Sequence, residues 1–315
     1  MINAIYQIIR TARPRQWLKN LSVFAAAFFA GNIYETNVLF PTAVAFVAFC
    51  MVSSGAYFIN DIVDAPKDRT HPIKKNRPIA SGKLSSKMAW SIALLLVGGS
   101  LVLSFRHVGT FFGLAIVGYI LLQISYSVHF RNIIIMDSLF VASGFVIRVF
   151  AGGIASNTSL SSWLVLTTIG LSLLMAFGKR RSEKTILNKH MVDSEEAKTR
   201  ETLRHYPDTL LDSMISMSSA FCILTYSLFA FQVSPRIASE TLTEILPSIL
   251  RSPKWMMVTI PVVIYGVARY LYVIYEKEDA ESPERVLLSD GALLSAVVVW
   301  GALVTVILYV LPQSI

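Results

Sequence analysis

Three aspartates in one short polar stretch are the residues of this sequence best suited to bind a metal ion. The stretch covers residues 60–83 (NDIVDAPKDRTHPIKKNRPIASGK), with Asp61, Asp64 and Asp68 directly after Asn60. Spacings of three and four residues place the three carboxylates on one face of a helix. Carboxylates on one face repel each other unless a cation lies between them, and Mg²⁺ held in this way keeps positions open for substrate phosphates. The spacing therefore predicts a divalent-cation site.

Basic residues follow the aspartates, and their side chains could pair with phosphate oxygens. They are Arg69, His71, Lys74, Lys75, Arg77, Lys83 and Lys87. A solvated cytoplasmic loop that obeys the positive-inside rule would account for these cations, but it would not account for the carboxylates. Pro66 lies inside the aspartate group, so we expect Asp68 to swing in from a bent or terminating helix.

The composition of the chain indicates that the helices carrying these residues lie in a membrane. The chain has 315 residues, of which 54% are hydrophobic and 15% are charged, and its mean hydropathy is +0.57. This composition predicts a polytopic, all-α membrane protein, because a soluble domain of this length carries far more charge. Cys50 and Cys222 each lie in an apolar run, which indicates small core residues and no disulfide framework.

Nine apolar segments are long enough to cross a bilayer, and we expect them to form one bundle around a central cavity. They cover residues 18–36, 39–62, 87–105, 109–128, 134–153, 161–179, 210–232, 255–275 and 290–311. The first is the weakest, because Gly31 and Asn32 interrupt it. We predict a single polytopic membrane domain over residues 1–315, with polar loops at residues 63–87, 180–209 and 276–290.

The distribution of lysine and arginine predicts the orientation of the spans. With the N-terminus in the cytoplasm, 22 of the 28 Lys and Arg residues lie in cytoplasmic segments and four lie on the opposite side. This bias favours an N-in, C-out topology and an odd number of spans. The net charge of +8 therefore needs no nucleic acid partner. We expect the cavity to open to the cytoplasm, with the chemistry at that face of the plasma (inner) membrane.

A basic segment near the N-terminus has two interpretations. Residues 11–20 are TARPRQWLKN, in which Arg15 and Lys19 share a helical face. Cations beside Trp17 are typical of an anchor at the membrane–water interface. Alternatively, Arg15 or Lys19 turns inward and holds an anionic group.

Arg148 lies well inside an expected span, where an unpaired arginine is costly. One interpretation is that it pairs with Asp137 or another carboxylate for structure alone, and the other is that it binds a phosphate in a pocket. Small residues nearby permit close helix packing. They are Ala142, Ser143, Gly144, Ala151, Gly152 and Gly153.

A second basic group, FGKRRSEK, occupies residues 177–184 at the cytoplasmic end of a span. Topology alone accounts for its cations, and the competing interpretation is that they hold the second phosphate group of a substrate. Asp208 and Asp212, four residues apart at the start of the next span, are weak evidence of a further acidic site.

Taken in order, these motifs resemble the UbiA superfamily of intramembrane prenyltransferases, and within it the decaprenyl-phosphate phosphoribosyltransferase branch. The segments that carry the resemblance are residues 13–20, 60–82, 126–127, 144–153, 177–183 and 282–290. The likeness departs from aromatic prenyltransferases at the loop after the sixth span. There a second aspartate-rich motif is typical, whereas this sequence has FGKRRSE and only the later Asp208 and Asp212.

The resemblance implies Mg²⁺-dependent transfer of 5-phosphoribose from phosphoribosyl diphosphate to a polyprenyl phosphate, with release of diphosphate. It implies metal ligands at Asn60, Asp61, Asp64 and Asp68, with catalytic roles for the three aspartates. Substrate-binding roles are implied for Lys19, Asn60, Arg69, Lys74, Arg77, Tyr126, Arg148, Lys179, Arg180 and Glu183.

Two other functions remain open on the sequence. One is transfer of a polyprenyl chain from its diphosphate to an aromatic or other acceptor. The other is secondary transport of an anionic solute through Arg148 and Arg269, which is disfavoured because the sequence has no inverted repeat. The sequence does not decide whether copies of the chain form a homo-oligomer.

Overall fold

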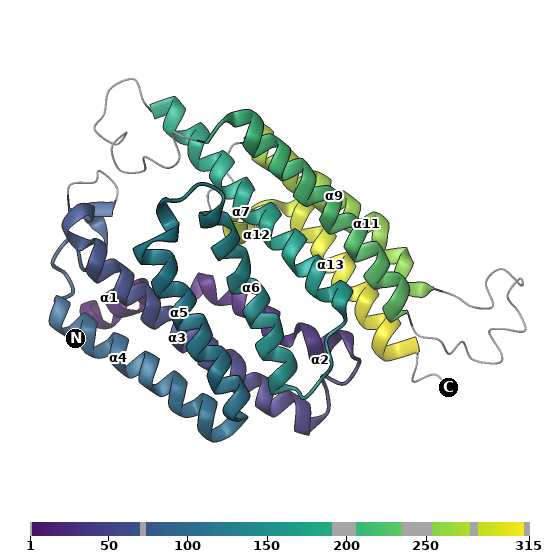
Figure 1. The fold of residues 1–315 in the computed structure, drawn as a ribbon, viewed down its shortest axis with the longest axis horizontal. Coiled ribbons are helices and arrows are strands. Elements are labelled where there is room, and N and C mark those ends of the chain that lie inside the picture. The colour runs from purple at the N-terminus through teal and green to yellow at the C-terminus, as the bar shows by residue number, and fades with distance from the viewer. Residues whose placement is uncertain (1, 70–73, 191–205, 235–253, 278–282, 312–315) are drawn as a thin grey trace, which may run out of the picture. The chain divides into compact units, whose positions relative to one another are not determined.

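The computed structural model describes the chain except for residues 1, 70–73, 191–205, 235–253, 278–282 and 312–315. Within the described residues, the regular elements are all helical (Figure 1). The chain divides into two compact units, one formed by Met1–Ser159 and the other by Leu160–His190 together with residues from Leu203 onward. The prediction of a single membrane domain stays a prediction. Parts of all three expected polar loops lie outside the described residues.

The first unit contains the aspartate stretch and the elements around it. Its elements are α1 (Ile2–Ala12), the 3₁₀ segment η1 (Pro14–Phe24), α2 (Ala25–Phe29), α3 (Thr36–Asp68), η2 (Lys74–Asn76), α4 (Ser86–Leu103), η3 (Ser104–Val108), α5 (Thr110–Val128), η4 (Phe130–Asn132) and α6 (Met136–Ala155).

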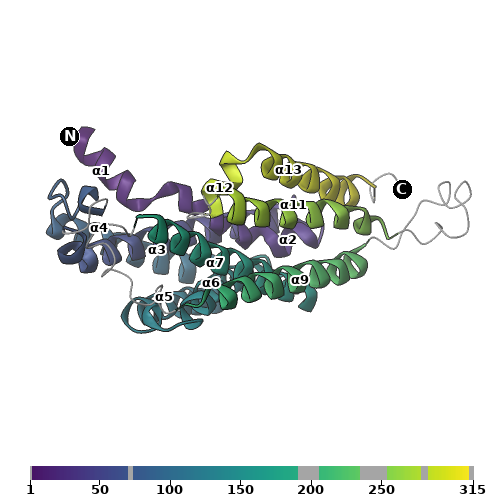
Figure 2. The same ribbon diagram turned by 90° about the horizontal axis from the view of Figure 1, so that it is seen from above.

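The second unit contains the later spans. Its elements are α7 (Ser162–His190), α9 (Asp208–Val233), η7 (Trp255–Thr259), α11 (Ile260–Tyr272), η8 (Val273–Lys277), α12 (Pro283–Ser289), α13 (Gly291–Thr305) and η9 (Val306–Val310). Helices α7 and α9 lie side by side in both views (Figures 1 and 2). Their backbones come close at Gly170, where an added Cβ would lie 2.9 Å from the Cα of Cys222.

Eight described helices are long and apolar enough to cross a membrane. They are Thr36–Asp68, Ser86–Val108, Thr110–Val128, Met136–Ala155, Ser162–Thr185, Asp208–Val233, Trp255–Glu276 and Gly291–Val310. The last eight expected segments are therefore confirmed as long apolar helices. The first, residues 18–36, differs from expectation: it is not one continuous helix but the end of η1, the short α2 and a turn before α3.

A close backbone contact in the first unit fixes η1 against α6. At Gly152 of α6, an added Cβ would overlap the backbone carbonyl of Val23 in η1. Val23 itself is fully buried in a core with Phe49, Phe112 and Tyr119, whose rings meet edge to face. Small residues in α6 thus permit the close approach that the sequence predicted, and this approach holds η1 against the core.

Candidate functional site

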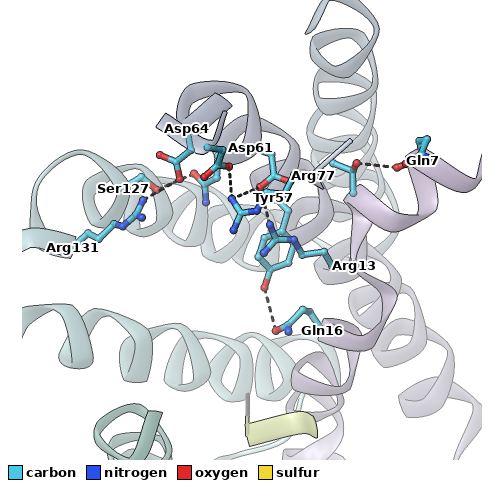
Figure 3. A network of polar contacts seen from close by, with 12 residues as sticks. Gln7, Arg13, Gln16, Tyr57, Asp61, Asp64, Arg77, Ser127 and Arg131 are labelled. Carbon is cyan, nitrogen blue, oxygen red and sulfur yellow. Dashed lines mark hydrogen bonds and ion pairs between the residues drawn. The ribbon is translucent and has the colours of Figure 1, made fainter. Parts of the chain in front are cut away.

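The last turns of α3 carry the three aspartates into one polar network. Helix α3 runs through Pro66 and ends at Asp68, so Asp68 lies at the end of a terminating helix, which is one of the two expected arrangements. Asp61 and Asp68 are 3% and 4% exposed, whereas a quarter of the Asp64 side chain is accessible. Burial of two ionised carboxylates is costly unless cations pair with them. Arginines from three other segments pair with the three aspartates, two of them with the buried pair and one with Asp64 (Figure 3).

Arg77 bridges two of the carboxylates. Its Nη1 lies 2.7 Å from Oδ2 of Asp68 and 3.2 Å from Oδ1 of Asp61. The segment that carries Arg77 is fixed because Ile79 and Leu84 are buried against Phe58 of α3. The predicted basic residue therefore reaches the predicted aspartates, and apolar packing of its own loop holds it there.

Arg13 supplies the second cation. Its Nη2 donates to Oδ1 of Asp61 at 2.7 Å, and its guanidinium carbon lies 4.7 Å from the centre of the Tyr57 ring. Tyr57 in turn donates to Oε1 of Gln16 at 3.4 Å. Arg13 has φ 54° and ψ 62°, in the left-handed region, where the chain turns from α1 into η1. This turn carries the side chain to α3.

Arg131 supplies the third cation, from the turn after α5. Its Nη1 donates to Oδ2 of Asp64 at 3.1 Å. One helical turn earlier, the Ser127 hydroxyl donates to Oδ1 of Asn60 at 3.0 Å. These two hydrogen bonds join the end of α3 to the end of α5, and Figure 3 shows Arg131 approaching Asp64 on the side away from Arg13.

Metal binding at this cluster is supported by its donor chemistry rather than by a preformed cage. No three Asp, Glu, His or Cys side chains in the described ranges converge to hold a metal ion. Instead, Arg77 lies between Asp61 and Asp68, where the spacing predicted a cation. Carboxylate and amide oxygens are the ligands that Mg²⁺ prefers, so the donor set of Asn60, Asp61, Asp64 and Asp68 fits this ion once arginine contacts are exchanged.

A groove of about 250 Å³ opens beside the aspartates. One face of α3 and one face of α5 line it, and Val97 of α4 closes it. Its polar end contains Asn60, Asp64, Ser127 and Arg131, while the remainder of its lining is largely apolar. Isolated polar groups at the end of an apolar groove are typical of sites for small amphipathic molecules.

Arg148 is buried and is held by neutral partners. Its Nε donates to Oδ1 of Asn20 at 2.7 Å, Nη1 donates to the carbonyl of Gly144 at 2.7 Å, and Nη2 donates to the Tyr119 hydroxyl at 2.8 Å. Among the described residues no carboxylate pairs with it, so the expected partner Asp137 is not its partner. The guanidinium also lies 4.8 Å from the centre of the Tyr119 ring. It thus joins η1, α5 and α6.

The basic group of residues 177–184 forms its own ion-pair network on α7 of the second unit. Arg180 Nη1 lies 2.6 Å from Oε2 of Glu183, and Lys179 Nζ lies 3.9 Å from Oε1 of the same carboxylate. Arg180 and Glu183 are buried. Glu183 therefore neutralises two of the cations that the sequence suggested as phosphate ligands.

The late aspartates belong to a neighbouring network in this unit. Arg181 Nε lies 2.9 Å from Oδ1 of Asp212, and Lys184 Nζ lies 3.0 Å from Oδ1 of Asp208. Tyr275 also donates to Asp212 at 3.0 Å. The two aspartates pair with cations from α7, and this pairing joins α7 to the start of α9.

Four further predicted residues lie on or next to elements of the first unit. Lys19 is half-buried on η1, Tyr126 is half-buried on α5, Lys74 is half-buried on η2, and Arg69 is exposed directly after α3. Their substrate-binding roles stay predictions.

Two aspartate partners, Arg13 and Arg131, were not among the predicted site residues. Arg13 lies in the RPRQWLKN motif, but a helical projection of that motif pointed to Arg15 and Lys19 instead. Because η1 is a 3₁₀ segment that starts after a left-handed residue, the projection did not apply. Arg131 could be found only by knowing that the end of α5 lies against α3.

The chain is similar to known proteins over nearly its whole length. The profile of the UbiA prenyltransferase family matches residues 20–289. A decaprenyl-phosphate phosphoribosyltransferase of Corynebacterium glutamicum is 32% identical over 309 residues, which cover 97% of this chain and 88% of the relative. The protein of the same name from Mycolicibacterium smegmatis is 33% identical, with 95% of this chain and 91% of the relative covered.

A solved structure shares the fold. The UbiA homolog of Archaeoglobus fulgidus bound to GPP and Mg²⁺ superimposes with a TM-score of 0.67 at 19% identity, covering 95% of this chain and 97% of the other. At this identity, the likeness concerns the fold alone.

Proposed function

The chain belongs to the UbiA prenyltransferase family, and we propose that it transfers 5-phosphoribose from phosphoribosyl diphosphate to a polyprenyl phosphate. The products are polyprenyl-phosphoryl-phosphoribose and diphosphate. The observation that carries this proposal is the similarity of nearly the full chain to proteins named decaprenyl-phosphate phosphoribosyltransferase. The ion-pair cluster at the end of α3 supports it, because transfer between two polyanions needs carboxylates for a metal and arginines for phosphate.

The reaction breaks one bond at C1 of the ribose and makes another. The C1–O bond to diphosphate breaks while positive charge builds on the sugar ring, as in other glycosyl transfers. An oxygen of the acceptor phosphate then bonds to C1, and the bonding electrons leave with diphosphate. The acceptor is already anionic, so a strong general base is not needed. The protein must therefore stabilise the departing diphosphate and exclude water.

The aspartates and arginines of the first unit divide this work. Asn60, Asp61, Asp64 and Asp68 would hold Mg²⁺, which when bound supplies a Lewis acid that neutralises charge on the leaving diphosphate. Arg13 and Arg77 both contact the carboxylate of Asp61, so their guanidinium forks are within reach of a diphosphate bound there. Planar forks match phosphate oxygens in pairs, and two forks on one side orient the leaving group. Further substrate-binding roles are proposed for residues outside these contacts: Lys19, Arg69, Lys74, Tyr126, Lys179, Arg180 and Glu183.

For Arg148 we propose a positioning role. Its hydrogen bonds hold Asn20 of η1 and Tyr119 of α5, and 6% exposure leaves little of it for a substrate. It would therefore act on the reaction through the placement of η1, which begins at the residue after Arg13.

We further propose nine crossings of the plasma (inner) membrane as one domain, N-in and C-out, with the active site at a cavity open to the cytoplasm. The 11 residues of η1 and the five of α2 would rise about 22 Å and about 7.5 Å if they continue in one direction, a sum close to the bilayer core of about 30 Å. The irregular segment is thus long enough for the first crossing, and the lysine and arginine bias favours this odd number.

One assay tests the function. The purified protein is incubated with Mg²⁺, phosphoribosyl diphosphate labelled in the ribose, and a polyprenyl phosphate, and the products are extracted into organic solvent. We expect label in the lipid fraction, dependent on Mg²⁺ and lost with EDTA. Label that remains aqueous while a polyprenyl diphosphate is consumed with an aromatic acceptor would replace this proposal with prenyl transfer.

A further inference from the structure

The groove between α3 and α5 differs from the ion-pair cluster in what it can bind. On α3 it is lined from Val52 to Asp64, and on α5 from Tyr119 to Val128. At 1.5 Å per residue, the α3 wall is about 18 Å long. The groove thus runs along the helices rather than across them. Its charged side chains, Asp64 and Arg131, lie at one end with Asn60 and Ser127, and Tyr119 and Gln123 are the polar side chains elsewhere in its lining.

The polar end offers donors suited to a phosphate monoester. Arg131 has five N–H donors, and its contact with Asp64 is a single hydrogen bond at 3.1 Å between partly exposed side chains. The Asn60 side chain accepts from Ser127 through its oxygen, so its amide NH₂ group is oriented by that bond. A guanidinium and an amide at one point form a small anion site, and Figure 3 shows Arg131 and Ser127 together beside Asp64.

The walls beyond this end suit a branched hydrocarbon chain. Ile59 and Val63 of α3 face Ile120 and Ile124 of α5 across the groove. Val63 is 67% exposed and Ile124 is 52% exposed, so the groove is open along its length. A cavity of about 250 Å³ is smaller than a typical drug-sized pocket of about 300–1,000 Å³. It therefore fits the head end of a long lipid, with the remaining chain lying in the bilayer against these exposed side chains.

We propose that this groove binds the polyprenyl phosphate acceptor, with its phosphate at Arg131 and Asn60 and its first isoprene units between Ile59 and Ile120. The inference rests on the proposed function, since it says where that function's lipid substrate lies. Asp64 shares the polar end, and its negative charge opposes a phosphate there unless a cation offsets it. At this end of the groove the acceptor phosphate would lie beside the aspartates, which would hold the diphosphate of the donor through Mg²⁺.

Photo-crosslinking of the full-length protein tests the site without relying on turnover. The probe is geranylgeranyl phosphate with a diazirine on its chain, added in Mg²⁺ buffer, irradiated and mapped by peptide mass spectrometry. We expect label on the α3 and α5 segments that contain Ile59, Val63, Ile120 and Ile124. Excess unlabelled polyprenyl phosphate should compete, whereas geranylgeraniol and inorganic phosphate at the same concentration should not. Competition by geranylgeraniol, or label confined to other helices, would overturn the proposal.

Matched variants sharpen the result. Ile120→Trp fills the groove and should reduce labelling by about tenfold, because the larger side chain occupies the space of the lipid; this corresponds to about 1.4 kcal/mol of binding free energy. Leu121→Trp, on the exposed side of the same helix and outside the lining, should label like the wild type. Arg131→Gln should weaken labelling without changing elution on size exclusion. Equal labelling of the two tryptophan variants, or full labelling of Arg131→Gln, would contradict the site.

The transfer assay separates this inference from the proposed function. If the wild type forms lipid-linked phosphoribose but the label maps elsewhere, only the lipid site is wrong. If the label maps to the groove but phosphoribosyl diphosphate yields no lipid product, the proposed donor is wrong and the lipid site remains.

Discussion

Arg13 and Asp61 lie 48 residues apart in the sequence, yet the Nη2 of one is 2.7 Å from the Oδ1 of the other. This pair joins the start of η1 to the end of α3. Because Asp61 also contacts Arg77, one buried carboxylate joins two segments that are remote in the chain. Substitutions here should therefore affect both charge and placement, and the two effects can be separated.

Replacement of the aspartates should abolish transfer more than it affects folding. Asp61→Asn and Asp64→Asn keep side-chain volume but remove a charge, so we expect transfer to fall by about 100-fold or more, as for other losses of electrostatic stabilisation. The measurement is label in the lipid fraction. Glu35→Gln, before the other end of α3, is the control and should keep wild-type activity. Substantial activity in both aspartate variants would rule out their role with the diphosphate.

Arg77→Lys tests whether the bridge between two carboxylates needs a guanidinium. Lysine is a compact point charge and cannot reproduce a planar fork. We expect a KM for phosphoribosyl diphosphate raised by about tenfold, since charged hydrogen bonds contribute 1.5–3 kcal/mol. Steady-state kinetics with varied donor measures the change, and Arg106→Lys, an exposed arginine on η3, should leave KM unchanged. An unaltered KM in Arg77→Lys would show that Arg77 does not contact the donor.

Arg148→Lys distinguishes positioning from phosphate binding. Arg148 makes these contacts from three separate nitrogens, whereas the three donors of lysine share one nitrogen. Lysine therefore cannot reach Asn20, Gly144 and Tyr119 together, and we expect a lower unfolding temperature and a lower kcat. The KM for both substrates should stay near the wild-type value. Thermal unfolding and kinetics are measured on the same preparation. A raised KM with unchanged thermal stability would instead support the phosphate-binding interpretation.

Gly152→Ala tests the packing of η1 on α6. The added methyl group would overlap the backbone of Val23, which cannot move as a flexible side chain can, so we expect lower thermal stability. Gly118→Ala on α5 meets no atom within 4 Å and should be neutral or slightly stabilising, because alanine favours a helix over glycine by about 1 kcal/mol. If the two variants unfold at the same temperature, the close approach of η1 and α6 is not needed for stability.

The parts of this protein that follow from local composition could be predicted, and the parts that depend on tertiary pairing could not. Eight of the nine apolar segments form long helices, because each is long and nearly free of charged residues. The aspartate face was predictable because Asp61, Asp64 and Asp68 lie on a single helix. Arg77 was predictable because it follows them in the same loop.

Other features needed the three-dimensional structure. Residues 18–36 are apolar enough for a span, but the structure divides them into the end of η1, the short α2 and a turn, and η1 packs against Gly152 of α6. The hydrogen-bond partners of Arg148 lie on η1, α5 and its own helix, so no spacing in the sequence identifies them. Arg131 lies 67 residues from Asp64, and only the pairing of α3 with α5 brings the two together.

At Arg13 the backbone conformation and the side chain favour different residues. A non-glycine residue in this conformation costs roughly 1–2 kcal/mol, whereas glycine adopts it freely and asparagine tolerates it. Either replacement would relieve the backbone but would remove the guanidinium that reaches Asp61. Selection for stability alone would therefore remove arginine from this position, and its presence indicates that the protein gives up some stability to place one positive charge.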